Sequence, residues 1–188
     1  MDQISVLKSV VQELDDLKLS YFLIGSFAVS YYGRPRATHD IDIKISSPQI
    51  TIKTLVDRFS KQFYISEEGI REALKHRTMF NLIHYETNTK VDFWILNEDP
   101  FDQERFKRKK MVNLLGVPTA ITTAEDLIII KLKWYQESES DKHLNDVKGI
   151  LEIQENKLDK KYIEKWIDQF HLQKEWKECL SFTKASTA

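Results

Sequence analysis

The six residues from Asp40 to Ile45 alternate strictly between charged and apolar side chains. Asp40, Asp42 and Lys44 hold one set of alternate positions, and three isoleucines hold the other. Because successive side chains of a β-strand point to opposite faces, the pattern predicts a strand with one face buried in a core. The two aspartates then share the other face, which makes this strand the first candidate for a functional site.

Apolar spacing elsewhere predicts further strands and helices in the first two-thirds of the chain. The predicted strands cover residues 21–24, 40–45, 79–85, 90–96, 112–115 and 118–121, and the predicted helices cover residues 4–17, 26–32, 47–59, 67–75 and 99–109. From Thr123 onward only helical patterns occur, around residues 124–135, 144–151, 159–170 and 173–182. We therefore predict an α+β (mixed α/β) core with flanking helices over residues 1–121. A helical portion, 122–188, follows and either packs with the core or forms its own unit.

The composition is that of an ordinary globular protein, and it excludes several classes. The chain has 188 residues, with 28 Lys and Arg against 29 Asp and Glu, so a generally basic DNA-coating protein is excluded. Cys179 is the one cysteine, which excludes an intrachain disulfide and a cysteine-rich metal site. There is no signal-peptide pattern and no apolar run long enough for a membrane span, so we expect a cytoplasmic protein with no membrane partner.

Two carboxylates at positions i and i+2 of a strand point the same way, with Cα atoms roughly 7 Å apart. Asp40 and Asp42 can therefore reach one Mg²⁺ ion or share a pair of ions. A half-exposed strand whose wet face carries aspartates by chance explains an isolated Asp-x-Asp equally well. The neighbouring sequence is needed to choose between a metal site and a chance pattern on an exposed strand face.

Gly25-Ser26 follows an apolar strand and begins a predicted helix, an arrangement that lets backbone N–H groups bind a phosphate. The alternative is a plain strand-to-helix turn. Asp92 lies within the otherwise apolar Val91–Ile95, where a carboxylate is rare unless it is paired or bound to metal. The alternative for Asp92 is an exposed edge strand.

The ordered set resembles the nucleotidyltransferase superfamily of DNA polymerase beta, and within it the small AbiE-type nucleotidyltransferase toxins. The motifs that carry the resemblance are Gly25-Ser26, Arg36-x-Thr38-x-Asp40-Ile41-Asp42, Asp92, the segment from Glu125 to Lys131, and Asp146.

The resemblance implies a nucleotidyltransferase-like core sheet and a role for each matching residue. Asp40, Asp42 and Asp92 would be catalytic and hold two Mg²⁺ ions (or Mn²⁺), with Asp92 helping the nucleophile to lose its proton. The nucleotide, ATP or another NTP, would be bound by Gly25, Ser26, Arg36, Thr38, Lys131 and Asp146, and Lys131 would also take part in catalysis.

The implied reaction moves a nucleoside monophosphate from an NTP to an acceptor hydroxyl. The acceptor is open: an RNA end such as that of tRNA, a protein or a small molecule. A toxin with an antitoxin partner is one possibility. A non-catalytic nucleotide sensor and a metal-dependent phosphodiesterase are the alternatives. Lys131 also suits a surface lysine whose stem is buried, and the basic run from Lys107 to Lys110 suits either a nucleic-acid acceptor or a solvated helix end.

Overall fold

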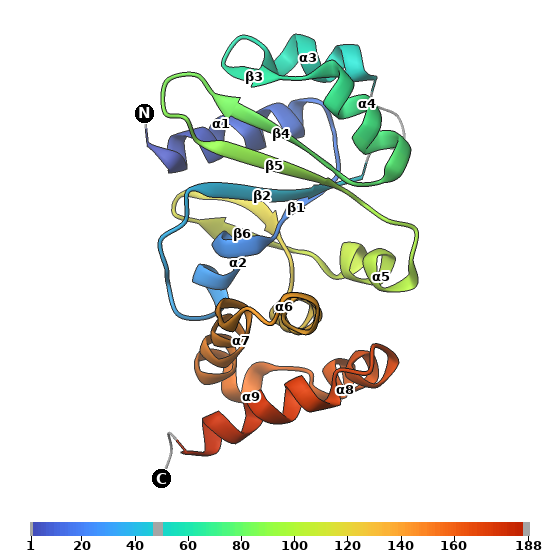
Figure 1. The fold of residues 1–188 in the computed structure, drawn as a ribbon. Helices are drawn as coiled ribbons and strands as arrows, with labels where there is room; N and C mark the ends of the chain where they lie inside the picture. The colour runs from blue at the N-terminus through green and yellow to red at the C-terminus, as the bar shows by residue number, and fades with distance from the viewer. Residues whose placement is uncertain (1, 47–50, 186–188) are drawn as a thin grey trace. The chain divides into compact units, whose positions relative to one another are not determined.

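The computed structural model describes residues 2–46 and 51–185 and divides the chain into two compact units (Figure 1). The first unit comprises residues 1–27 and 37–122, and the second comprises residues 28–36 and 123–188. The border after Thr122 lies one residue from the predicted end of the core, and residues 28–36 belong to the second unit. Within residues 2–46 and 51–185, no helix is both long and apolar enough to cross a membrane.

The first unit is built on one mixed sheet of seven strands in the order β3-β4-β5-β2-β1-β7-β6. Its strands are β1 (Tyr21–Leu23), β2 (Asp40–Ile45), β3 (Phe63–Ile65), β4 (Met79–His84), β5 (Lys90–Ile95), β6 (Lys110–Leu114) and β7 (Val117–Ile121). The pairs β2–β5 and β1–β7 are parallel, and the other neighbours are antiparallel. The predicted α+β class is confirmed. Of the seven strands within residues 2–46 and 51–185, β3 is the one that the apolar pattern did not predict.

Helices lie on both faces of this sheet. They are α1 (Gln3–Asp16), α3 (Ile52–Phe59), α4 (Glu67–His76) and α5 (Pro100–Arg108). The ring of Phe59 on α3 lies 5.9 Å from Phe93 on β5, and an ion pair joins Arg58 of α3 to Glu13 of α1. On the other face, Phe106 of α5 lies 6.0 Å from Phe22 of β1. The predicted start of α3 at Ser47-Pro48 lies outside the described residues. The described helix begins after its N-cap Thr51.

The isoleucines of β2 form the core on the face that carries Phe93. Ile41, Ile43 and Ile45 are fully buried, as the alternation predicts, and Phe93 stacks on Phe80 of β4 at 5.2 Å. Each large apolar side chain buried in this way contributes roughly 1.5–3 kcal/mol to folding. The opposite face of β2 and β5 carries the polar side chains of Asp40, Asp42, Lys90 and Asp92 where the two strands begin.

The second unit is helical. Its elements are α6 (Ala124–Ser138), α7 (Asp141–Gln154), a short 3₁₀ helix (Glu155–Lys157), α8 (Lys160–Gln169) and α9 (Gln173–Ala185), together with most of α2 (Gly25–Tyr32). Two of its helices begin at side-chain N-caps: Thr123 Oγ1 accepts from Asp126 N, and the Asp159 carboxylate accepts from Tyr162 N. Inside the unit the Tyr162 hydroxyl donates to the fully buried Asp126 at 2.6 Å.

Candidate active site

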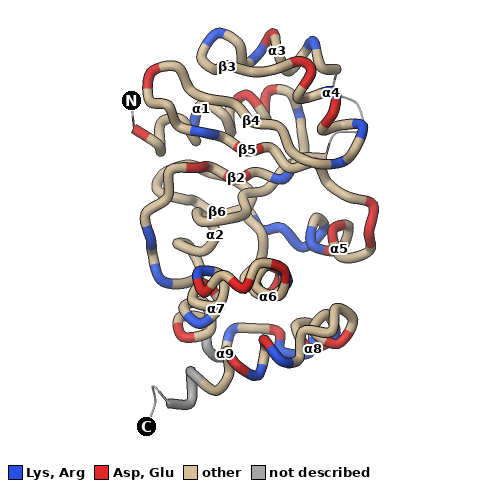
Figure 2. The backbone as a smooth tube through the Cα atoms, in the orientation of Figure 1, with Lys and Arg blue, Asp and Glu red and all other residues tan. Residues whose placement is uncertain are grey.

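The candidate site is built on two neighbouring parallel strands, β2 and β5. Their register pairs Asp42 with Asp92 and Asp40 with Lys90. Neighbouring strands lie about 4.8 Å apart, and paired residues point to the same face. All four side chains therefore share one face of the sheet, and in Figure 2 acidic segments of β2 and β5 run side by side. The structure thus brings the third predicted carboxylate beside the first two.

The three carboxylates differ in exposure. Asp40 is exposed, Asp42 is half-buried, and Asp92 is buried with 6% of its surface exposed. β5 lies between β4 and β2, so an exposed edge strand does not explain Asp92. A buried carboxylate costs folding free energy unless a cation or hydrogen bonds compensate it. Asp92 is therefore the residue of the three that most needs an explanation.

Lys90 supplies part of that compensation, and sequence reasoning did not predict it. Its Nζ donates to Asp92 Oδ2 at 2.8 Å. The hydrogen bond to Asp92 raises the pKa of Lys90 above its usual value, with the charges of Asp92, Asp40 and Asp42 adding to the effect against partial burial. The position of Lys90, two residues before Asp92 on a strand, is the signal that could have placed it on this face.

The turn at Gly25 packs directly against Asp42. Gly25 has a φ of +62°, and a Cβ placed there would lie 2.1 Å from Asp42 Oδ2 and 2.8 Å from Asp42 Cβ. Only glycine adopts this backbone conformation without strain and also leaves room for the carboxylate. The backbone N–H of Ile24 donates to the Asp42 carbonyl at 3.0 Å, which ties the turn to β2. The predicted phosphate-binding turn and the predicted metal ligand are therefore neighbours.

Ser26 and Thr38 flank this arrangement in the first unit. Ser26 is buried in the first turn of α2, directly after Gly25. The Thr38 hydroxyl donates to the Asp40 carbonyl at 3.1 Å, so it orders the backbone where β2 begins. A role of Thr38 toward a nucleotide stays a prediction.

The remaining predicted residues form a separate cluster in the second unit. Asp146 on α7 accepts from Arg36 Nε at 3.0 Å and from Lys131 Nζ, on α6, at 2.8 Å. Lys131 is 2% exposed, and burial lowers its pKa against the opposing effect of Asp146. The alternative of a lysine that reaches the surface is therefore wrong. His143, one turn before Asp146, has a pKa lowered first by burial and then by the charge of Lys131.

The predicted site residues thus fall into two groups. The first unit holds the three carboxylates, Gly25, Ser26 and Thr38, and the second holds Arg36, Lys131 and Asp146. Within each group the structure gives direct contacts between the predicted residues.

The first group has the donor chemistry that a magnesium ion prefers, namely carboxylate oxygens on rigid strands. Among the described residues, Asp92 Oδ1 is buried and has no hydrogen-bond partner, which suits an oxygen that binds a cation or a substrate proton. Over the same residues, no three His, Cys, Asp or Glu side chains converge closely enough to hold an ion by themselves. The donor chemistry of the carboxylates therefore suits Mg²⁺ as partial ligands only, and oxygens from a substrate would have to complete its coordination.

The basic run after Glu104 is partly internal. Arg105 is buried, donates to Asp102 at 3.2 Å and lies over the Phe22 ring. Lys109 lies 3.7 Å from the centre of the Phe106 ring. Lys107 and Lys110 are exposed.

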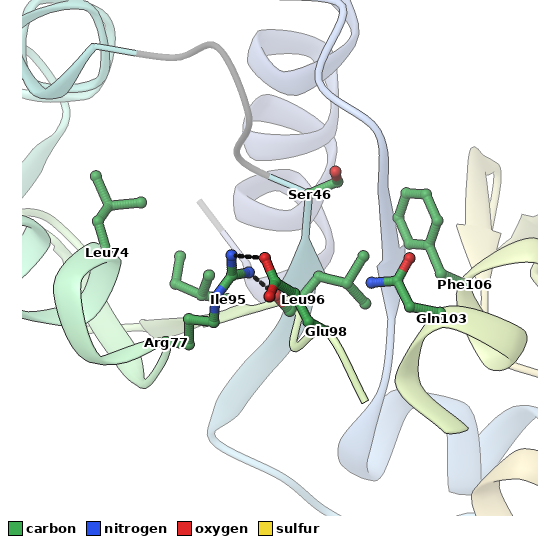
Figure 3. Close-up of a pocket in the computed structure, with 8 residues that line it drawn as sticks. All are labelled: Ser46, Leu74, Arg77, Ile95, Leu96, Glu98, Gln103 and Phe106. Atoms are coloured by element: carbon green, nitrogen blue, oxygen red, sulfur yellow. Dashed lines mark hydrogen bonds and ion pairs between the residues drawn. The ribbon is translucent and has the colours of Figure 1, made fainter. Parts of the chain in front are cut away.

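A cavity of about 570 Å³ lies at the other end of β2 and β5 (Figure 3). Its lining includes Ser46 and Leu96, which follow these strands, whereas Asp40 and Lys90 begin them. Arg77 donates to the Leu96 carbonyl at 3.0 Å and pairs with Glu98, as Figure 3 shows. The cavity is therefore distinct from the carboxylate face, and the chain's own groups satisfy its arginine.

The fold of this chain is nucleotidyltransferase-like, as comparison with solved structures shows. The sequence matches no protein-family model and no curated protein sequence. Solved structures do match. ANT(2″)-Ia in complex with adenylyl-2″-tobramycin superposes with a TM-score of 0.62 at 13% identity, covering 91% of this chain and 98% of that chain.

Two further solved structures share the fold of this chain. An antigenic nucleotidyltransferase-like protein from Paracoccidioides brasiliensis gives a TM-score of 0.56 at 17% identity over 96% of this chain and 93% of that chain. The lincosamide antibiotic adenylyltransferase LnuA, lincomycin-bound, gives a TM-score of 0.53 at 11% identity, over 81% of this chain and 98% of that chain. Identities this low show a shared fold. The descriptions of these three proteins name no AbiE-type toxin, and that finer resemblance stays a prediction.

Proposed function

We propose that this protein is a magnesium-dependent nucleotidyltransferase that transfers a nucleoside monophosphate from an NTP to an acceptor hydroxyl. The observation that supports it most is the packing of the Gly25 turn against Asp42, with Asp92 beside Asp42 on the next strand. A phosphate-binding turn and two carboxylates on rigid elements are what phosphoryl transfer requires, because positioning and charge stabilisation account for most of its catalysis.

In the proposed reaction an acceptor oxygen attacks the α-phosphorus of the NTP. The new bond joins the acceptor oxygen to phosphorus, the bond between the α-phosphorus and the bridging oxygen breaks, and pyrophosphate leaves. Asp92 Oδ1, which has no hydrogen-bond partner among the described residues, would take the acceptor proton. Asp40 and Asp42 would hold Mg²⁺, which would neutralise phosphate charge.

The acceptor is an RNA end, a protein or a small molecule. Two of the fold neighbours are described with an adenylylated or bound antibiotic, which makes antibiotics a natural first panel. A toxin with an antitoxin partner in the cytoplasm is a finer proposal. Growth arrest when the wild-type chain is expressed, but not when an Asp42→Asn variant is expressed, would support it.

The test incubates the protein with each α-labelled NTP, Mg²⁺ and separate pools of total RNA, cell protein and antibiotics. We expect label to move to one pool, and we expect Asp42→Asn and Asp92→Asn to reduce transfer at least about a hundredfold. Asp57→Asn, on the exposed side of α3, is the charge-matched control and should keep wild-type transfer.

Two other outcomes would select a different function. A thermal shift with NTP but no transfer to any pool would indicate a nucleotide sensor on the same fold. Cleavage of RNA without added NTP would indicate a phosphodiesterase. The close packing of Gly25 on Asp42 disfavours the latter, since a phosphodiesterase needs no triphosphate-binding turn.

A further inference from the structure

Lys90 is the side chain bonded to Asp92 on the carboxylate face, and the proposed reaction does not use it. It begins β5, with Asp40 as its partner on β2 and Ile83 as its partner on β4. Its side chain is 37% exposed, whereas that of Asp92, to which it is bonded, is 8% exposed. Lys90 therefore reaches from the solvent-exposed end of the face toward the buried carboxylate.

The hydrogen bond divides the two oxygens of Asp92 between different partners. Oδ2 accepts from Lys90 Nζ at 2.8 Å, and Oδ1 is buried without a partner among the described residues. An ammonium is a compact charge with three donors, similar in electrostatic effect to a weakly charged metal ion. Lys90 thus satisfies the oxygen that a second cation would otherwise take.

The formal charges of the carboxylate face also indicate that Lys90 takes the place of a second cation. Lys44, farther along β2, is paired with Asp102, so the three carboxylates and the Lys90 ammonium leave a formal charge of −2, which a single divalent cation balances. A further divalent ion is balanced only when the triphosphate arrives with its own negative charge. Without nucleotide, Lys90 and a second ion compete for Asp92.

We propose that Lys90 is a resident cation of this site: a positioning residue that holds Asp92 through Oδ2 and competes with a divalent ion for that carboxylate until nucleotide binds. The inference rests on the proposed function only in so far as the face binds divalent ions. It makes Lys90 a determinant of how many ions bind before the nucleotide does.

The test measures binding of Mn²⁺, as a probe for Mg²⁺, to the nucleotide-free full chain by calorimetry. Lys90→Met removes the charge and keeps the length of the side chain. We expect it to bind Mn²⁺ roughly tenfold more tightly than wild type, because a like charge a few ångströms from the ion is removed. Lys90→Arg keeps the charge and should bind Mn²⁺ as wild type does. Lys8→Met, an exposed lysine of α1, is the matched control.

Thermal unfolding with and without Mn²⁺ gives a second, independent readout. Lys90→Met leaves Asp92 buried without its cation, so we expect a lower Tm than wild type without Mn²⁺ and a larger rise when Mn²⁺ is added. In Lys90→Met/Asp92→Asn both effects should disappear, because the carboxylate for which the cations compete is gone.

The outcomes separate this proposal from the proposed function. If wild type binds no Mn²⁺ with or without nucleotide, the metal-dependent function is wrong. If wild type binds Mn²⁺ and Lys90→Met binds it equally or more weakly, the function stands and the competition by Lys90 is wrong. The same conclusion follows if Mn²⁺ raises the Tm of both proteins by the same amount.

Discussion

Replacing Gly25 by alanine tests whether the turn and Asp42 are built as one unit. The new Cβ would lie 2.1 Å from Asp42 Oδ2, which rotation of the carboxylate can relieve. It would also lie 2.8 Å from Asp42 Cβ, which is fixed to the strand backbone and cannot rotate away. At a φ of +62°, a non-glycine residue costs roughly 1–2 kcal/mol by itself. The collision adds about 1–3 kcal/mol, typical of an overpacked site.

Gly116→Ala separates these two costs. Gly116 has a φ of +86° in the turn between β6 and β7, and no atom lies within 4 Å of a Cβ built there. It therefore shares the backbone strain and lacks the collision. We expect Gly25→Ala to be less stable than Gly116→Ala by about 1–3 kcal/mol, or about 2–4 °C in Tm for each kcal/mol.

A double-mutant cycle with Asp42→Gly then assigns the collision to one partner. Asp42→Gly removes the Cβ and the carboxylate that the new methyl group meets. The coupling energy from urea unfolding of the four proteins should equal the excess of about 1–3 kcal/mol. Equal stability of Gly25→Ala and Gly116→Ala, or a coupling energy near zero, would refute the close packing on which the phosphate-turn argument depends.

Three further predictions concern the second unit. Asp146→Asn should lower the free energy of unfolding, measured by thermal unfolding, by about 3–5 kcal/mol because it leaves Lys131 charged and buried. Lys131→Met should lower it by less, since Arg36 still pairs with Asp146. Equal losses in the two variants would contradict the pairing. Tyr162→Phe removes the 2.6 Å hydrogen bond to the buried Asp126 carboxylate and should lower the free energy of unfolding in urea by about 1.5–3 kcal/mol. A loss below about 0.5 kcal/mol would contradict the contribution of this hydrogen bond. Burial raises the pKa of the Cys179 thiol to about 12, so native protein at pH 8 should react with iodoacetamide far more slowly than protein unfolded in urea. Because its folded-state pKa is raised, the thiol contributes stability that is lost as the pH rises from about 9 toward 12; fast native alkylation at pH 8 would show that α9 opens.

The elements that were predicted correctly are those whose signal is local. Alternation placed β2, and apolar residues at helical spacing placed α6 and α8. β3 has three residues, and tertiary pairing with β4 supplies what so short a segment cannot encode by itself.

The site was partly predictable for the same reason. The side-chain direction of Asp40, Asp42 and Asp92 follows from the period of a strand, but the pairing of β2 with β5 is a long-range property. That pairing decides that Lys90 meets Asp92, so Lys90 was not predicted. The grouping of Arg36 with Asp146, 110 residues later, is likewise long-range and was reached only through the family resemblance.

Asp92 is the residue that connects stability with function in this fold. It lies on a strand between two others, 6% exposed, with one oxygen held by Lys90 and the other without a partner among the described residues. A buried acceptor that lacks a hydrogen bond costs about 1–3 kcal/mol. An asparagine would carry no charge there and would cost less. A carboxylate in this position is therefore unfavourable for folding alone and becomes favourable only when a cation or a substrate proton reaches Oδ1, which is the property that the proposed transferase site beside Asp42 requires.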